Sequence, residues 1–195
     1  RVLASAPNRL EVWNGEHGKL VEVLTGHDAA VRSGAISMGD ATLITADADR
    51  MVNVWDLASA REAGSHQGSQ HDARVVSLAV SCTGSLVVSR DARGTVIAWD
   101  GATGREMARG TISMAEADED QDPLSSRKAK SRSEGKRFVD FVRPTLFVTA
   151  GENEPITVWR VSGSALESVA TLRPADPEYH SIAVALMKVS SICIS

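Results

Sequence analysis

The chain has very little cysteine: among 195 residues only Cys82 and Cys193 are present, and no pair stands at metal-ligand spacing. Structural zinc sites take three or four closely spaced Cys and His ligands, so the sequence predicts no metal site. His66, His71 and Asp72 lie near one another but lack such partners, and we interpret His27 and His71 as structural residues. Two lone cysteines are typical of a reducing compartment.

Long apolar runs and concentrated charge are also absent. No run approaches the roughly 18 apolar residues of a membrane span, and the first residues carry no signal-peptide pattern. The net charge of −4 and the pI near 5.7 disfavour nucleic-acid binding by bulk electrostatics. We therefore expect an intracellular protein without membrane contact.

Motifs of catalysis are missing as well. There is no Gly-rich phosphate loop, no Ser/His/Asp set outside the repeating positions described below, and no carboxylate pair outside a charged run. The sequence predicts that the chain is not an enzyme and has no cofactor and no small-molecule substrate.

What the chain does have is four tryptophans at the ends of similar β-branched runs: Trp13, Trp55, Trp99 and Trp159. The first two intervals, 13 to 55 and 55 to 99, match a propeller-blade period of roughly 40–45 residues. The third interval is longer, which indicates an insertion before Trp159.

The clearest repeat runs from residue 26 to residue 56. Strands are predicted at 31–36, 43–46, 51–55 and 60–64, with a tight turn at 47–50, so the unit is a four-stranded antiparallel sheet. His27 precedes Trp55 by the same interval as His71 precedes Trp99. Thr45, Ser89 and Thr149 each stand ten residues before a tryptophan.

This Gly-His to Trp-Asp pattern resembles the WD40-repeat family. The resemblance implies an all-β propeller in which a His, a Ser or Thr, a turn Asp and the Trp form a hydrogen-bonded tetrad. Seven blades need nearly 300 residues by the same period, so we expect about four blades of a larger propeller.

Carried over residue by residue, the resemblance implies one complete tetrad, formed by His27, Thr45, Asp49 and Trp55. The next repeat supplies His71, Ser89 and Trp99, but Arg93 stands where the Asp is expected and Asp91 lies two positions early. The repeat after it retains Thr149 and Trp159, with Asn153 at the Asp place and Ser131 at the His place. We therefore expect its inner strand, 138–143, to be held by packing rather than by the tetrad network, and this blade to be the least ordered.

The predicted organisation follows from these repeats: the end of a preceding blade (1–25), blades at 26–64, 65–110 and 138–172, a charged insertion (111–137), and the start of a further blade (173–195). The insertion combines an acidic run at 115–122 with a basic run at 125–137. Such composition cannot offset its ordering entropy, so it predicts a disordered loop. A second interpretation of Arg127 to Arg137 is an RNA-contacting or nuclear-import arm.

The favoured function is a non-catalytic scaffold for protein–protein interaction in a large assembly, because propeller loops present side chains on a rigid frame. By the family resemblance, Arg32 and Arg74 at the wider rim would face a partner. Residues 75 to 160, above all Leu146 to Glu152 and the insertion, are similar to transducin-beta-like WD proteins of the small-subunit processome. Those proteins assemble with U3 small nucleolar RNA and act in ribosomal RNA maturation.

That similarity favours the nucleus and nucleolus over the cytoplasm. Two alternatives stay open: a scaffold in cytoskeletal, ciliary or trafficking complexes, and a substrate-recruiting module that reads a modified peptide.

Overall fold

The computed structural model describes residues 2–6, 9–37, 41–57, 61–65, 71–112, 137–151 and 154–172. Every regular element in these ranges is a β-strand. The described residues therefore include no helix of the length and apolarity that crossing a bilayer requires.

The strands form four antiparallel sheets that follow one another along the chain. The first sheet contains β1 (Val2–Ala6), β2 (Arg9–Asn14) and β3 (Lys19–Leu24). The second contains β4 (Val31–Ile36), β5 (Thr42–Asp47), β6 (Val52–Asp56) and β7 (Arg61–Ser65). The third contains β8 (Val75–Val80), β9 (Leu86–Asp91), β10 (Thr95–Asp100) and β11 (Glu106–Thr111). The fourth contains β12 (Arg137–Arg143), β13 (Leu146–Gly151), β14 (Ile156–Ser162) and β15 (Ala165–Leu172).

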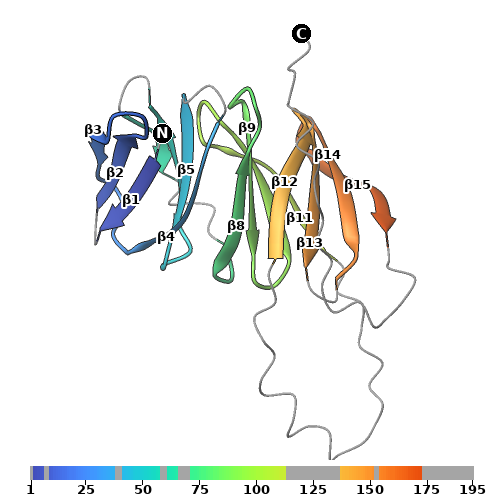
Figure 1. The fold of residues 1–195 in the computed structure, drawn as a ribbon. Coiled ribbons are helices and arrows are strands. Elements are labelled where there is room, and N and C mark those ends of the chain that lie inside the picture. The colour runs from blue at the N-terminus through green and yellow to red at the C-terminus, as the bar shows by residue number, and fades with distance from the viewer. Residues whose placement is uncertain are drawn as a thin grey trace, which may run out of the picture.

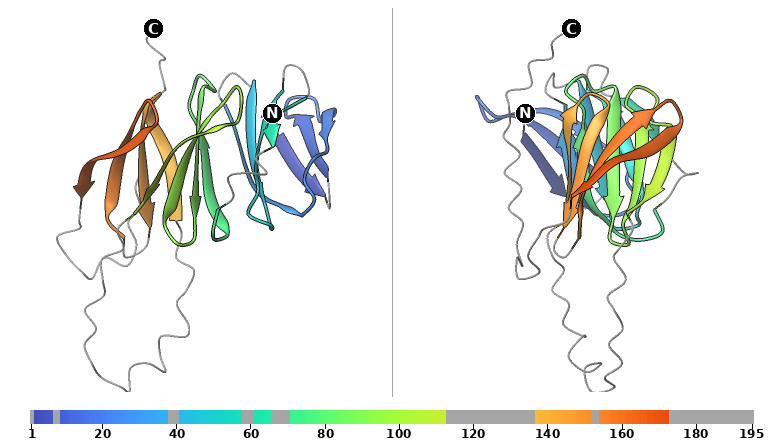
Figure 2. Two further views of the ribbon diagram at one scale, coloured as in Figure 1. Left: turned by 180° about the vertical axis from the view of Figure 1, so that it is seen from behind. Right: turned by 90° about the vertical axis from the view of Figure 1, so that its right-hand side faces the viewer.

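The four sheets lie side by side in chain order, from blue at the N-terminus to orange (Figure 1). The same row is seen from behind and from its edge in Figure 2. The first strands of the last three sheets are neighbours, since β4 contacts β8 and β8 contacts β12. This is the arrangement of consecutive propeller blades, and it confirms the predicted all-β propeller with antiparallel blades.

Apolar side chains fill each space between successive sheets. One cluster joins Leu10, Val12 and Leu24 of the first sheet to Leu43 and Trp55 of the second. A second cluster packs Ile44, Ala46, Val52 and Val54 against Val75, Val87, Ile97 and Trp99. A third places Val88, Val96 and Ala98 against Val139, Phe147 and Trp159. Trp55, Trp99 and Trp159 thus each pack against the preceding sheet. Each of these sheets is therefore stabilised by its neighbour, and not by its own contacts alone.

The first sheet departs from the four-stranded expectation, because its described part has three strands. Its tryptophan, Trp13, is only half-buried and donates its indole N–H to Glu11 at 3.2 Å. Among the described residues, exposed large apolar side chains occur only in the first and fourth sheets: Leu20, Val21, Val23, Val142, Val169 and Leu172. Only these two sheets lack a described neighbour on one face, which accounts for that exposure.

The strand bounds can be compared with the predicted divisions. Thr111 belongs to β11 and Arg137 to β12, so the strands on either side reach into both ends of the range predicted as an insertion. The remaining insertion residues, 113–136, and the predicted further blade at 173–195 lie outside the described residues.

Candidate functional site

The end of the second sheet where β5 turns into β6 is organised by four buried side chains. One ring nitrogen of His27, Nδ1, lies 2.8 Å from Oδ2 of Asp47, and the other, Nε2, lies 2.6 Å from Oγ1 of Thr45. Trp55 donates its indole N–H to the same hydroxyl at 2.8 Å. A neutral imidazole with its proton on Nδ1 satisfies every group in this chain, because the Thr45 hydroxyl then donates to Nε2.

The third sheet repeats this arrangement. His71 Nδ1 lies 3.3 Å from Asp91 Oδ2, His71 Nε2 lies 2.7 Å from Ser89 Oγ, and Trp99 donates to Ser89 Oγ at 2.8 Å. All four side chains are buried. The structure therefore brings together the three residues predicted in this sheet, and Asp91, two positions before the expected place, completes the tetrad.

The prediction that Asp49 belongs to the tetrad is wrong, because the carboxylate beside His27 is that of Asp47. Alternate residues of a strand point to the same face, so Asp47 at the end of β5 shares the face of Thr45. Asp49 stands in the exposed turn that follows. The spacing carries the signal that was missed, since Asp47 and Asp91 each stand eight residues before a tryptophan.

Both aspartates also close the turn that follows them. Asp47 Oδ1 accepts the backbone N–H groups of Asp49 and Met51 at 2.9 and 3.0 Å. Asp91 Oδ1 accepts those of Arg93 and Thr95, both at 2.9 Å. Arg93 is thus a turn residue that donates its backbone N–H to the carboxylate of Asp91. Each aspartate links its histidine to the hairpin backbone.

The Asp91 carboxyl has a pKa below its ordinary value of 3.8. Burial acts in the opposite direction and would raise it. The hydrogen bond from His71 and the N–H groups of Thr95 and Arg93 stabilise the ionised form more than burial destabilises it. The carboxylate is therefore a structural anion rather than a candidate proton donor near neutral pH.

The turns themselves place two residues in the left-handed backbone region. Gly94 has φ of +89°, whereas the corresponding residue in the second sheet is Arg50, with φ of +69°. A non-glycine residue rarely adopts this conformation. The Arg50 guanidinium donates to the main-chain oxygen of Asp72 at 3.0 Å, which ties the turn of the second sheet to the loop entering the third.

The fourth sheet keeps only half of the tetrad. Trp159 donates to Thr149 Oγ1 at 2.9 Å. Gly151 stands at the place taken by the aspartate in the other sheets, while Asn153 and Ser131, the candidates from the sequence, lie outside the described residues.

An ion cluster occupies this end of the fourth sheet. Arg90, buried in β9, donates to the main-chain oxygen of Ala150 at 2.8 Å and to the Glu154 carboxylate. Arg137 donates to the other oxygen of Glu154 at 2.8 Å. The N–H of Val139 also donates to Ser77 Oγ of β8 at 3.0 Å. Val139 of this inner strand packs in the apolar cluster between the third and fourth sheets, and these polar contacts add to that packing. Sequence reasoning missed the cluster because its members lie far apart in the chain.

Arg32 and Arg74 are both exposed at the tetrad end of the sheets. Arg32 occupies the irregularity between Val31 and Ser33 where β4 slips against β5, and such a bulge redirects a side chain. Arg74 directly precedes β8, and its carbonyl accepts the N–H of Ala92 at 2.9 Å. The structure thus places both arginines on one rim, in neighbouring sheets.

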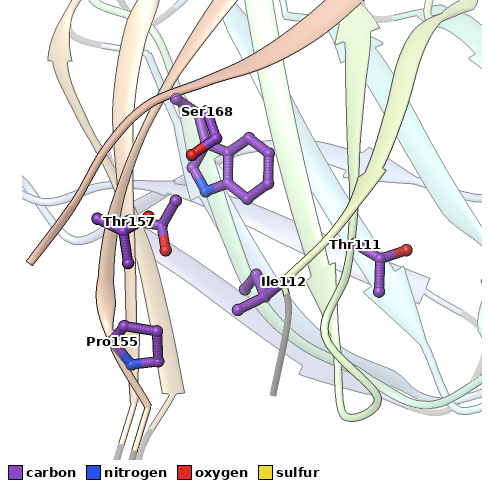
Figure 3. Close-up of a pocket in the computed structure, with 7 residues that line it drawn as sticks. Thr111, Ile112, Pro155, Thr157 and Ser168 are labelled. Atoms are coloured by element: carbon purple, nitrogen blue, oxygen red, sulfur yellow. The ribbon is translucent and has the colours of Figure 1, made fainter. Parts of the chain in front are cut away.

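A cleft of about 520 Å³ opens between the third and fourth sheets. Thr111 and Ile112 line one side of it, and Pro155, Thr157 and Ser168 line the other (Figure 3). Trp159 and Thr171 complete the lining. None of the described residues that line it has an ionisable side chain. Within the described ranges, no three His, Cys, Asp or Glu side chains gather as metal ligands would.

Comparison with known proteins points to one family. The family model described as WD domain, G-beta repeat matches residues 18–56. No curated protein matches the sequence.

Among solved structures, Hsv2 from Kluyvelomyces marxianus is similar with a TM-score of 0.65 at 10% identity, covering 85% of this chain and 52% of that one. The WD40 repeats of RRP9 give a TM-score of 0.56 at 18% identity, and U3-55K gives 0.56 at 17%. Both alignments cover 77% of this chain and 41% of the other. The chain therefore spans about half of these structures, or less.

Such low identities establish the fold alone, but the fold agrees with the family match and with the tetrads described above. WD40 propellers serve in general as non-catalytic platforms for protein interaction. The matched repeat at residues 18–56 and the stacked antiparallel sheets together give this chain the fold of a WD40-repeat β-propeller.

Proposed function

We propose that the chain is a non-catalytic scaffold that binds other proteins of a large assembly through the rim bearing the tetrads. The observation that carries this proposal is that rim segments of neighbouring sheets are joined directly, as Arg50 joins the loop at Asp72 and Arg90 joins Glu154. A surface held in this way loses little conformational entropy when a partner binds. Arg32 and Arg74 are the proposed partner-facing residues on it.

The assembly we propose is the small-subunit processome, with a role in ribosomal RNA maturation. Support comes from the similarity of residues 75–160 to transducin-beta-like WD subunits and from the likeness of the fold to RRP9 and U3-55K. One of these two is named for U3, the RNA with which the resembling family assembles. The proposal includes residence in the nucleus and nucleolus, and RNA contact through Arg127 to Arg137.

Affinity purification of the full-length protein, with sequencing of bound RNA and identification of bound proteins, tests the proposal. We expect U3 small nucleolar RNA and processome proteins to co-purify. Axonemal, cytoskeletal or coat proteins without that RNA would instead support the alternative scaffold. A single modified peptide ligand would support the recruitment module.

The rim is tested by the double variant R32E/R74E. Its matched control is R105E/R143E, which changes two exposed arginines at the opposite ends of the sheets. Partner recovery is expected to fall about tenfold or more for the rim variant, as for loss of charges at the centre of an interface, and to be retained by the control. Equal losses for both variants would contradict this assignment of the rim.

A further inference from the structure

The strand position that faces the next sheet differs between the second and third sheets. Ala46 in β5 and Arg90 in β9 each stand nine residues before a tryptophan. Ala46 belongs to the apolar cluster between the second and third sheets. Arg90 instead sends a fully buried guanidinium from the third sheet into the fourth. An isolated buried cation is costly, so this arginine requires a counter-charge.

That counter-charge comes from the sheet that lacks the histidine and aspartate. Glu154 is buried and accepts from Arg90 through one carboxylate oxygen and from Arg137 through the other. Arg137 pairs with Gly151 across β12 and β13, as Val75 pairs with Asp91 across β8 and β9. Arg137 and Glu154 therefore meet at the strand ends where His71 and Asp91 meet in the third sheet.

Gly151 supplies the space for this exchange. A Cβ atom added to Gly151 would lie 2.5 Å from the Glu154 carboxylate and 3.1 Å from Cγ of Arg137. An aspartate at this position, as in the other two sheets, is incompatible with the position of Glu154. The missing tetrad and the ion cluster are thus alternative solutions for one site.

Burial changes the pKa of the Arg90 guanidinium. Desolvation lowers its pKa from the ordinary value, and the neighbouring Glu154 carboxylate offsets part of that effect. Its Nε–H is the one buried side-chain polar atom of the described residues without a hydrogen-bond partner. The Glu154 carboxylate is therefore the main counter-charge of the buried Arg90 guanidinium.

We propose that Arg90, Glu154 and Arg137 form an inter-blade clamp that replaces the lost half of the fourth tetrad and makes the third and fourth sheets one cooperative unit. A tetrad ties strands within one sheet, whereas this clamp ties two sheets to each other. Arg137 is the first residue of β12, so the clamp also holds the first strand of the fourth sheet where that strand begins. This inference does not depend on the proposed function.

Native-state hydrogen exchange of the full chain tests the clamp through the variant E154Q. Neutralising Glu154 leaves two cations without a carboxylate, and we expect amide exchange in β12, β13 and β14 to quicken about tenfold or more. Exchange in β5 and β6 should stay within about twofold. E106Q is the matched control, because it breaks the partly exposed Glu106–Arg109 pair within β11. Uniform quickening in all sheets, or none, would overturn the proposal.

Two more variants keep the test decisive if E154Q does not fold. R137Q removes the part-exposed member of the cluster and should cause a smaller, equally localised quickening. The double variant R90M/E154M replaces the buried pair by apolar side chains of similar size, and it should exchange more slowly than R90M alone. If the second substitution only adds to the damage, Arg90 and Glu154 are not coupled and the clamp is refuted.

Discussion

In the third sheet an imidazole, a carboxylate, a hydroxyl and an indole satisfy one another. In the fourth sheet the hydroxyl and indole remain, and two guanidinium groups share a carboxylate. The first solution keeps its contacts inside one sheet. The second reaches into the neighbouring sheet. In this chain the repeat without the His–Asp pair lies beside a repeat that supplies Arg90, so the buried space is filled and its polar groups are paired by another set of side chains.

The largest effect is expected from removing a fully buried tryptophan of a complete tetrad. Trp99→Ala should lower the free energy of unfolding by about 3–5 kcal/mol, because it leaves a cavity and removes the N–H donor to Ser89. Denaturant unfolding of the full chain measures this loss. Trp13→Ala is the control, since Trp13 is half-buried and donates its indole N–H to the side chain of Glu11 rather than to a tetrad hydroxyl. Similar losses at both positions would show that the tetrad adds nothing to burial.

A smaller loss of stability is expected from substituting Asp47, and a smaller one still from substituting Asp49. Asp47→Asn replaces the oxygen beside His27 and should cost about 1–3 kcal/mol by leaving a buried ring nitrogen poorly paired. Asp49→Asn changes an exposed turn residue and should cost less than about 1 kcal/mol. Thermal unfolding of the two variants side by side measures the difference. A larger loss for Asp49→Asn would restore Asp49 as the tetrad member.

The tetrad of the third sheet should also make the free energy of unfolding depend on pH in the acidic range. Because the pKa of Asp91 is lower in the folded chain than its ordinary value of 3.8, the unfolded chain binds the proton first. Its contribution is complete above about pH 3.8 and is lost as the pH falls through the lower folded value.

Unfolding curves at decreasing pH should therefore show stability falling below about pH 4, with a shallower fall in Asp91→Asn. A slope unchanged by the substitution would mean that other carboxyl groups carry the whole acid dependence.

The smallest effect is expected from deleting residues 113–135. Their charged composition predicts that they bury little apolar surface, and changes in loop length cost little. The melting temperature should shift by less than about 2 °C, and differential scanning calorimetry of the deletion variant measures it. A drop of about 5 °C or more would show that the insertion packs against the sheets.

The sequence predicts most of the tetrad residues, which recur at fixed spacings. It does not predict the ion cluster of Arg90, Glu154 and Arg137, which occurs once. Three kinds of residue recur at fixed spacings, so one repeat predicts the next: the tryptophans, the hydroxyl residues Thr45 and Ser89, and the histidines His27 and His71. Asp47 and Asp91 were missed because the family pattern was given more weight than strand alternation, which puts each aspartate on the face of its hydroxyl partner.

The ion cluster had no comparable signal. Arg90 and Glu154 meet only after two sheets have stacked, and nothing local in either stretch indicates their contact. Gly151 gave a partial hint, since glycine at a position held by aspartate in two other repeats marks space taken by another group.

The two kinds of contact also differ in the length of chain that they close. Within the tetrads the joined residues are 10 to 20 positions apart, whereas Arg90 and Glu154 are 64 positions apart with the insertion between them. Closing a longer loop costs more entropy and delays the contact during folding. The second and third sheets should therefore gain amide protection earlier than the fourth in pulse-labelling experiments, and the fourth sheet should dock last onto a surface that is already assembled.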